Sequence, residues 1–188
     1  MVKPLTKGVH VASITRFLSA AVLVPTLAFA QGKPVVEIGT DLGVTMLTSG
    51  GESSTVFNIP GQGILGQPTI RATFFAGRSL TLEPQLALTW VSYDGGTQTR
   101  VGLGGQIGYL FKGSTAKSLY VAGSLALLSI SEDNSDTDFG LGGKLGVRVP
   151  CGSSVGVRFE GGYRRWFNHE INEITLGVGV GGIVHRTK

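Results

Sequence analysis

The sequence RFEGGYRRW, residues 158–166, alternates between charged and apolar side chains, and this alternation is the strongest indication of the fold. Even positions hold the charged residues Arg158, Glu160 and Arg164, and odd positions hold Phe159 and Tyr163. Successive side chains of a β-strand point to opposite faces, so the segment is predicted to be a strand with one apolar face and one charged face. Such a strand fits the wall of a small barrel with lipid outside and polar groups inside.

The first 30 residues have the three-part pattern of a secretory signal peptide. A basic part without acids is followed by an apolar run over residues 17–29 and by small residues at a cleavage site. The bases are Lys3, Lys7 and Arg16, and the cleavage-site alanines are Ala28 and Ala30. A membrane anchor is the alternative, but Pro25 interrupts the run, which is shorter than the roughly 20 residues of a spanning helix. We therefore expect a cleaved signal peptide, residues 1–30, and one mature barrel domain, residues 31–188.

Net charge and cysteine content narrow the range of functions. The whole chain has 16 Lys and Arg against 12 Asp and Glu, and three of the bases lie in the expected signal peptide. The mature chain keeps 13 bases and 12 acids, a net charge of +1, which gives no support to nucleic-acid binding. Cys151 is the only cysteine, so no intramolecular disulfide can brace the fold.

Eight segments of the mature chain are predicted to be strands. They cover residues 35–47, 68–76, 80–93, 98–111, 118–131, 137–149, 155–166 and 173–185. In residues 118–131 both faces are apolar, and the outward side chains are assigned as Leu119, Val121, Leu125 and Leu127. Residues 48–67 form the longest connection, in which residues 54–59 could extend a strand beyond the membrane.

Only turns connect these segments, and no helical period occurs in the mature chain. Each of the segments has the roughly 9 to 11 residues that a tilted strand needs to cross a bilayer. The prediction is an all-β protein, an eight-stranded antiparallel up-and-down transmembrane β-barrel. An eight-stranded barrel has an interior just wide enough for side chains to fill.

The charged residues with inward parity are balanced. The acids are Glu37, Asp41, Glu83, Asp138, Glu160 and Glu173, and the bases are Arg71, Arg100, Lys144, Arg148, Arg158 and Arg164. Unpaired charges in so narrow an interior would carry a large desolvation cost, so the balance predicts a closed, ion-paired lumen. Many inward glycines would make room for the long arginines. The alternative is a water-filled lumen in which the balance is accidental.

The remaining charges separate by end. The outer turns, taken with the amino terminus in the periplasm, are acidic: Glu52, Asp94, Glu132, Asp133, Asp136 and Glu170. The inner turns and termini are basic: Lys33, Arg78, Lys112, Lys117, Arg186 and Lys188. We expect the basic rim to lie against anionic lipid headgroups. The acidic rim is hypothesised to hold divalent cations among the phosphates of lipopolysaccharide.

Aromatic residues are expected at both lipid interfaces, as in lipid-facing barrels. Those predicted at outer ends are Trp90, Tyr93, Tyr163 and Trp166, and those at inner ends are Phe74, Tyr109, Phe111 and Tyr120. Arg165 has outward parity beside Trp166 and would either bind a lipid phosphate or extend to water.

The signal peptide, the eight alternating segments and the EGGYRRW strand, residues 160–166, together resemble the small OmpA/OmpX-type outer-membrane β-barrel domain family of Gram-negative bacteria. The resemblance covers residues 35–185. It implies a location in the outer membrane, contact with outer-membrane lipids and insertion by the barrel-assembly machinery. Members usually end on an aromatic residue that this machinery reads, whereas this chain ends IVHRTK, so insertion by the standard signal is expected to be weakened.

Some eight-stranded outer-membrane barrels modify lipid A, and a similar enzymatic activity is an alternative for this chain. A hydrolase needs a nucleophile beside an oriented base, but His169 lacks the His-x-Ser spacing of such deacylases and is predicted to be a solvated turn residue. No His, Cys and carboxylate cluster has metal-ligand spacing, and no cofactor is expected.

The function predicted is a non-enzymatic outer-membrane barrel that contributes to envelope structure or surface interaction. No particular surface partner is indicated. Two alternatives remain, a soluble periplasmic lipocalin-like barrel that binds a small apolar ligand, and a lipid A-modifying outer-membrane enzyme.

Overall fold

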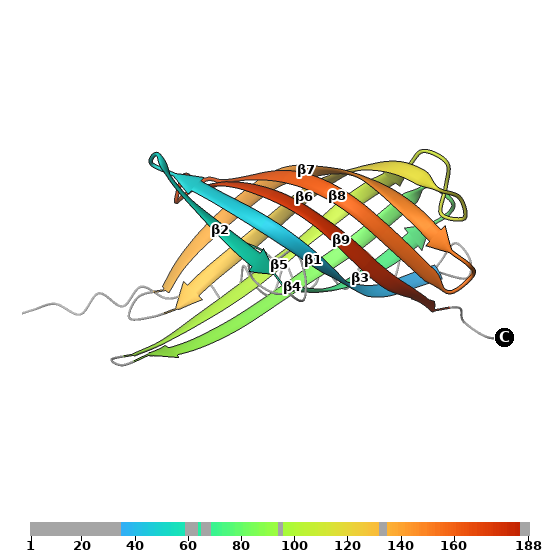
Figure 1. The fold of residues 1–188 in the computed structure, drawn as a ribbon. Coiled ribbons are helices and arrows are strands. Elements are labelled where there is room, and N and C mark those ends of the chain that lie inside the picture. The colour runs from blue at the N-terminus through green and yellow to red at the C-terminus, as the bar shows by residue number, and fades with distance from the viewer. Residues whose placement is uncertain (1–34, 59–63, 65–68, 94–95, 132–134, 185–188) are drawn as a thin grey trace, which may run out of the picture.

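The computed structural model describes residues 35–58, 64, 69–93, 96–131 and 135–184 (Figure 1). The expected signal peptide and its cleavage site, at Ala28 and Ala30, lie outside these residues. Among the described residues there is no helix long and apolar enough to cross a membrane.

The described residues form nine β-strands. They are β1 (Val35–Ser49), β2 (Glu52–Asn58), β3 (Thr69–Ala76), β4 (Leu80–Tyr93), β5 (Gly96–Leu110), β6 (Ser118–Ser131), β7 (Ser135–Cys151), β8 (Val155–Trp166) and β9 (Asn172–Val184).

Eight of these strands close into a barrel. β1 and β3 to β9 pair in chain order, and every pairing is antiparallel. The ring closes where β1 pairs with β9, from Val36 opposite Val184 to Thr48 opposite Asn172. The predicted eight-stranded up-and-down barrel is therefore confirmed.

The ninth strand, β2, lies within the long connection that follows β1. It turns back on β1 at Gly50 and Gly51, both with positive φ, and pairs with β1 from Ser49 to Gly43. β3 pairs with the other half of β1, from Val35 to Gly39. A strand was foreseen only as an option for residues 54–59, whereas the paired segment begins at Glu52.

The two ends of the barrel differ. We call the end that holds Val35 and Val184 the inner end, and the opposite end the outer end (Figure 1). Strands β3, β5 and β7 finish at the inner end, and strands β1, β4, β6 and β8 finish at the outer end.

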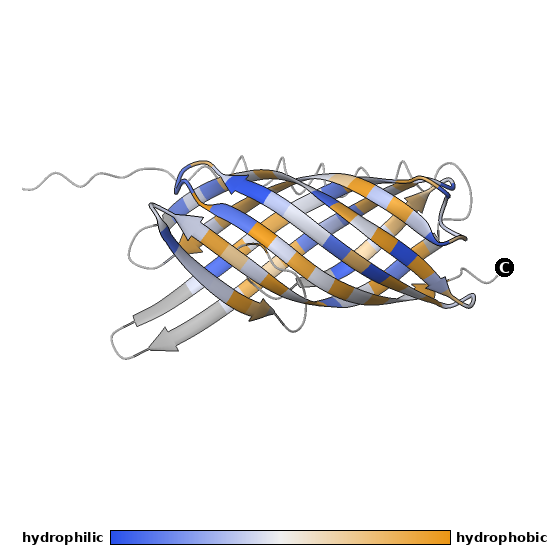
Figure 2. Cartoon of the chain, turned by 45° about the horizontal axis from the view of Figure 1, so that its top comes forward, coloured by the Kyte–Doolittle hydropathy of each residue, from blue (hydrophilic) through white to orange (hydrophobic). Residues whose placement is uncertain are grey.

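Apolar and polar residues alternate along the strands, as the banding of Figure 2 shows. On β6, buried and exposed side chains alternate from Ser118 to Leu125. Leu119, Val121 and Leu125 are exposed on the outside, as assigned from the sequence, and Leu127 is partly exposed. The inward face of β6 is also apolar because it contributes to two buried clusters.

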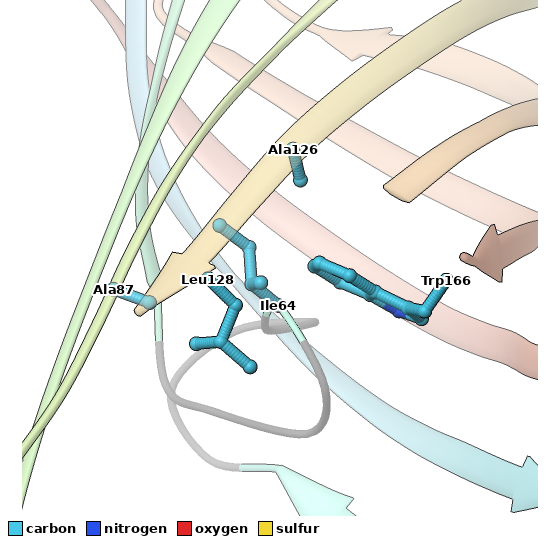
Figure 3. Close-up of a cluster of buried hydrophobic side chains, with 5 residues drawn as sticks. All are labelled: Ile64, Ala87, Ala126, Leu128 and Trp166. Atoms are coloured by element: carbon cyan, nitrogen blue, oxygen red, sulfur yellow. The ribbon is translucent and has the colours of Figure 1, made fainter. Parts of the chain in front are cut away.

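The barrel interior is layered. At the inner end Phe75, Leu110, Tyr120 and Ala122 form one apolar cluster. Towards the outer end a second cluster contains Ile64, Ala87, Ala126, Leu128 and Trp166 (Figure 3). Charged side chains are interspersed with these clusters: Arg148 stacks over Phe75, and Trp166 donates to Glu173. No pattern in the sequence predicts that Ile64, in the connection between β2 and β3, is buried in the interior.

Close strand packing predicts different outcomes for two glycines on neighbouring strands. A Cβ atom at Gly142 would lie 2.8 Å from the Arg164 Cα and nearer still to the Tyr163 carbonyl oxygen, whereas Gly123 has no atom within 4 Å. Gly142→Ala should therefore lower the free energy of unfolding by about 1–3 kcal/mol, as overpacking does. Gly123→Ala should change it by about 0.5 kcal/mol or less. Denaturant unfolding of the barrel in detergent micelles measures both, and equal effects would contradict this register.

Candidate functional site

The barrel interior is the candidate functional site, because the strand register directs most of the charged side chains into it. Eleven of the twelve charges predicted for the lumen are buried, and Arg100 is partly exposed. The buried ones are Glu37, Asp41, Arg71, Glu83, Asp138, Lys144, Arg148, Arg158, Glu160, Arg164 and Glu173.

Eight of these residues form one continuous chain of ion pairs, which we call the central network. Its acids are Glu37, Asp41, Glu83 and Glu160, and its bases are Arg71, Lys144, Arg148 and Arg158. Four negative and four positive charges leave the network with no net charge. It is drawn from β1, β3, β4, β7 and β8, so it ties together strands that are not neighbours in the sheet.

One end of the central network lies near the inner apolar cluster. Arg148 Nη2 is 2.7 Å from Glu37 Oε2, and Arg71 Nη2 is 3.4 Å from Glu37 Oε1. The Arg71 Nη1 atom lies 2.7 Å from Asp41 Oδ1, which continues the chain towards the middle of the barrel. Arg148 also stacks over the Phe75 ring, with its guanidinium carbon 5.0 Å from the ring centre.

Arg158 is the centre of the network because it contacts three carboxylates. Its Nη1 is 2.7 Å from Glu83 Oε2, its Nε is 3.1 Å from Glu160 Oε2, and its Nη2 is 3.7 Å from Asp41 Oδ2. These acids come from β4, β8 and β1. A single buried guanidinium thus connects three strands, with two hydrogen bonds to Glu83 in the fork geometry that arginine offers a carboxylate.

Neutral polar groups complete the shell of the acids. Glu83 also accepts hydrogen bonds from Thr73 at 2.6 Å and from Gln106 at 2.8 Å. Glu160 accepts one from the Tyr120 hydroxyl, in addition to its ion pair with Lys144 at 2.8 Å. Buried carboxylates need such donors, because an unsatisfied charge in a low-dielectric interior is costly.

Glycines supply the space for these side chains. A Cβ atom at Gly179 would overlap the Asp41 carboxylate and lie 2.9 Å from Arg71 Nη1. A Cβ atom at Gly156 would lie 2.6 Å from Glu37 Oε2. The inward glycines of β8 and β9 thus leave room for the ion pairs, as the sequence pattern predicted.

A second charged group lies nearer the outer end. Arg164 Nη1 is 3.3 Å from Glu173 Oε2, and the Trp166 indole nitrogen donates to the same oxygen at 2.8 Å. Beside them, a cavity of about 10 Å³ is lined in part by Lys144, Arg164 and Glu173. This is roughly the volume that one water molecule needs.

Two aromatic predictions are wrong. Trp166 was expected at the lipid interface, but it is fully buried among the inward side chains. Its even parity, shared with Arg164, directs it inward, where its ring also lies beneath the Arg164 guanidinium. Tyr120, expected in the inner girdle, is likewise buried, and it bonds to Glu160. In both cases strand parity was the better guide than the amphipathic character of the ring.

The other predicted interface residues have different positions. Tyr109, Phe111 and Tyr163 are exposed on the outside of the barrel. Arg165 is partly exposed and donates through Nη1 to the Glu170 carbonyl oxygen at 2.9 Å and to Asn172 Oδ1 at 3.1 Å. The side chains of Trp90 and Tyr93 are outside the described ones.

The rim charges are placed only in part. At the outer end Glu52, Asp136 and Glu170 are exposed, and at the inner end Arg78, Lys112 and Lys117 are exposed. The side chains of the other rim charges lie outside the described residues, and they are Lys33, Asp94, Glu132, Asp133, Arg186 and Lys188.

Asp138 and His169 form a separate site at the outer end. Asp138 is buried, and its carboxylate contacts the His169 ring, with Oδ2 2.8 Å from Nδ1. Within the described part of the chain, it does not pair with a base of the central network. The prediction that His169 is a solvated turn residue was incomplete. The residue is in an exposed turn, yet both ring nitrogens contact carboxylates. Among the described residues, no group of three His, Cys, Asp or Glu is arranged to hold a metal ion.

The strand pairing and the distribution of side chains define the class of the fold. It is a closed eight-stranded barrel of the outer-membrane type, with a charged interior and an apolar exterior. No family model matches the chain, and no curated protein matches it. Several solved structures, however, match the fold of this chain. Neisserial surface protein A is 17% identical with a TM-score of 0.59, and the match covers 78% of this chain and 96% of that one.

Two further outer-membrane structures have the same fold. Ail, the attachment invasion locus protein of Yersinia pestis, is 11% identical with a TM-score of 0.51, and 81% of this chain and 100% of that one are covered. The amino-terminal barrel domain of OprF from Pseudomonas aeruginosa is 15% identical with a TM-score of 0.50, over 82% of this chain and 100% of that one. At these identities the likeness establishes the fold.

Connectivity of the central network predicts non-additive effects of mutation. Glu160→Gln and Lys144→Met should each lower the free energy of unfolding by about 3–5 kcal/mol, because each leaves a buried charge without its partner. The double variant should cost less than the sum of the two by about 1–3 kcal/mol. The exposed Glu52→Gln serves as a control and should change stability by about 0.5 kcal/mol or less.

The double-mutant cycle needs denaturant titrations, in the same detergent, of the wild type, the two single variants and the double variant. Strict additivity of the two substitutions would show that Glu160 and Lys144 are not energetically coupled.

Proposed function

We propose that this chain is a non-enzymatic outer-membrane β-barrel with a closed, ion-paired lumen, which contributes to envelope structure or surface interaction. The observation that carries the proposal is the distribution of side chains between the two faces of the barrel wall. Apolar side chains cover the outside, and a charge-balanced network occupies the inside.

The exterior supports a lipid environment. Large apolar side chains more than half exposed occur on β1 and on six further strands of the ring, and they include Leu42, Leu86, Ile107, Leu119, Leu145, Phe159 and Leu176. Monomeric soluble proteins rarely expose apolar surface this extensively. The same residues are where a transmembrane barrel places its lipid-facing band.

The interior disfavours the lipocalin-like alternative. A barrel that binds an apolar ligand needs an apolar cavity, but here the middle of the lumen holds four acids and four bases in contact with one another. The cavity beside Lys144 and Glu173 has a volume of only about 10 Å³, too small for such a ligand. The buried apolar clusters that share the interior with the network also support a closed lumen.

The contacts of His169 argue against a role as the general base of a hydrolase. A general base needs a free ring nitrogen beside the nucleophile, but Nδ1 faces Asp138 and Nε2 faces Asp136, each at 2.8 Å. The hydroxyl of Ser49 donates to the His169 carbonyl oxygen at 3.2 Å and not to the ring. The proposal includes no cofactor.

The partners proposed are outer-membrane lipids, with lipopolysaccharide at the outer end, and the barrel-assembly machinery. Ail has been crystallised with the heparin analogue sucrose octasulfate, a polyanion. The outer end of this barrel exposes Glu52, Asp136 and Glu170, so a bare polyanion would be repelled there. Divalent cations between these acids and lipid phosphates would remove the repulsion, and Arg165 lies close enough to the rim to contact a phosphate directly.

The membrane assignment predicts that the protein fractionates with outer membranes and migrates faster in gel electrophoresis when it is not boiled. The reason is that a closed barrel keeps its compact shape in detergent until it is heated. A protein that stays in the soluble periplasmic fraction, with the same mobility before and after boiling, would overturn the proposal.

Two outward leucines at different membrane depths allow the same substitution to be compared. Leu145, on the outside of β7 near its middle, and Leu80, at the inner end of β4, are both exposed. In phospholipid vesicles Leu145→Arg should lower the free energy of unfolding by about 2–4 kcal/mol, and Leu80→Arg by about 0–1 kcal/mol. Equal effects at the two depths would count against a membrane-spanning exterior.

A further inference from the structure

The last outer turn, residues 167–171, contains a histidine held between two carboxylates of the neighbouring strand. His169 Nδ1 is 2.8 Å from Asp138 Oδ2, and His169 Nε2 is 2.8 Å from Asp136 Oδ2. Asp136 and Asp138 lie near the start of β7, and the turn that carries His169 joins β8 to β9. The proposed barrel function makes no use of this arrangement.

Proton counting determines which form of the ring fits the site. A neutral imidazole has one N–H donor and one nitrogen lone pair, whereas an imidazolium has two donors. Ionised carboxylates only accept hydrogen bonds. With a neutral ring, one of the two 2.8 Å contacts would set a nitrogen lone pair against a carboxylate oxygen. Only the protonated ring satisfies both contacts, and both are then charge-assisted.

The same turn is fastened and strained at other points. Asp138 also accepts hydrogen bonds from the backbone nitrogens of Asn168 at 2.9 Å and His169 at 3.2 Å. Glu170 has a φ of 51°, an uncommon left-handed conformation for a residue other than glycine. Such backbone conformations persist only where surrounding contacts hold them.

Among the described residues, charged groups near His169 come from β7, from β8, from the turn itself and from the β1–β2 hairpin. β7 contributes Asp136 and Asp138, β8 contributes Arg165, and the turn itself contributes Glu170. The Arg165 guanidinium bonds to the Glu170 carbonyl oxygen and lies 4.0 Å from its carboxylate. On the β1–β2 hairpin, Ser49 donates to the His169 carbonyl, and its pairing partner Glu52 is an exposed acid. The acids nearest the ring therefore outnumber the bases.

We propose that His169 is a proton-operated latch, which fastens the β8–β9 turn to β7 when its ring is protonated and releases the turn when the proton is lost. Release breaks the contact with Asp136 or with Asp138, and the strained backbone at Glu170 can then relax. Trp166 immediately precedes this turn and donates its backbone N–H to Ile171. Opening the turn would therefore loosen the cover over the outer part of the lumen.

The direction of the pH dependence follows from the surroundings. The hydrogen bond to Asp138 raises the pKa of His169 above its ordinary value, partial burial opposes the rise, and Asp136 adds to it. A group with a raised pKa in the closed turn stabilises that turn fully below its ordinary pKa of about 6.5. The stabilisation is lost as pH rises through the raised value. The latch is thus closed in acid and open in alkali.

The test uses the mature barrel, residues 31–188, in detergent micelles. Imidazole NMR over pH 5–9 gives the pKa of His169, which is assigned through the His169→Gln variant. Amide hydrogen exchange of residues 167–171, corrected for the intrinsic pH dependence of exchange, reports opening of the turn. Each unit by which the His169 pKa exceeds that of free histidine should appear as about tenfold more opening once pH passes the raised value.

Three variants separate the latch from a general effect on the turn. His169→Gln should remove the pH dependence of protection. Asp136→Asn removes one carboxylate from an exposed position and should lower the pKa of His169 and the size of the change in protection. Glu170→Gln alters an acid of the same turn whose carboxylate does not contact the ring, so it should leave both values as in the wild type.

A His169 pKa at or below the ordinary value would overturn the proposal. Protection of residues 167–171 that stays constant across the titration, or that changes equally in the wild type and in His169→Gln, would also overturn it. None of these readouts depends on where the barrel is located in the cell, so failure of the latch and failure of the proposed function can be told apart.

Discussion

Arg158 lies in the middle of a barrel interior that is too narrow to hydrate it, and its guanidinium is neutralised by three carboxylates from three strands. The need to compensate buried charge explains much of the remaining structure. It accounts for the equal numbers of acids and bases in the central network, and for the neutral donors around Glu83 and Glu160. A buried ion pair is not by itself strongly stabilising, since desolvation offsets the Coulomb attraction. Its effect here is on specificity, because a strand shifted by one residue would send its charges into the apolar exterior.

The same requirement explains the composition of the wall. Long arginine side chains fit inside an eight-stranded barrel only where the facing residues are small, and glycines at positions 156 and 179 leave that space for Arg148 and Arg71. Outside, leucine, isoleucine and phenylalanine occupy the alternate positions of the strands. Two buried apolar clusters occupy the interior beside these charges. Strand alternation, glycine content and charge balance are therefore three consequences of one packing problem.

Most of the correct predictions of inward and outward side chains came from strand parity. The period of two in residues 158–166 placed Arg158, Glu160 and Arg164 inside, and the same rule placed Leu119 and Leu145 outside. Parity could not pair individual charges, because Arg158 meets Asp41 and Glu83 across the barrel and not along a strand. Trp166 was misplaced because its ring suggested an interface although its parity was inward. Ile64 and His169 lie in connections between strands, where no period relates sequence to position, so neither the burial of Ile64 nor the contacts of His169 could be predicted.

We propose that a neutral network of ion pairs closes the lumen, and ion conduction across a bilayer tests this directly. The purified mature barrel is inserted into planar phospholipid bilayers at neutral pH and moderate salt, and current is recorded over a range of voltages. No steady conductance is expected, because the cavity beside Lys144 and Glu173 has room for about one water and buried apolar clusters share the interior with the network. A stable conductance proportional to voltage in every inserted molecule would mean a continuous water-filled lumen and would contradict it.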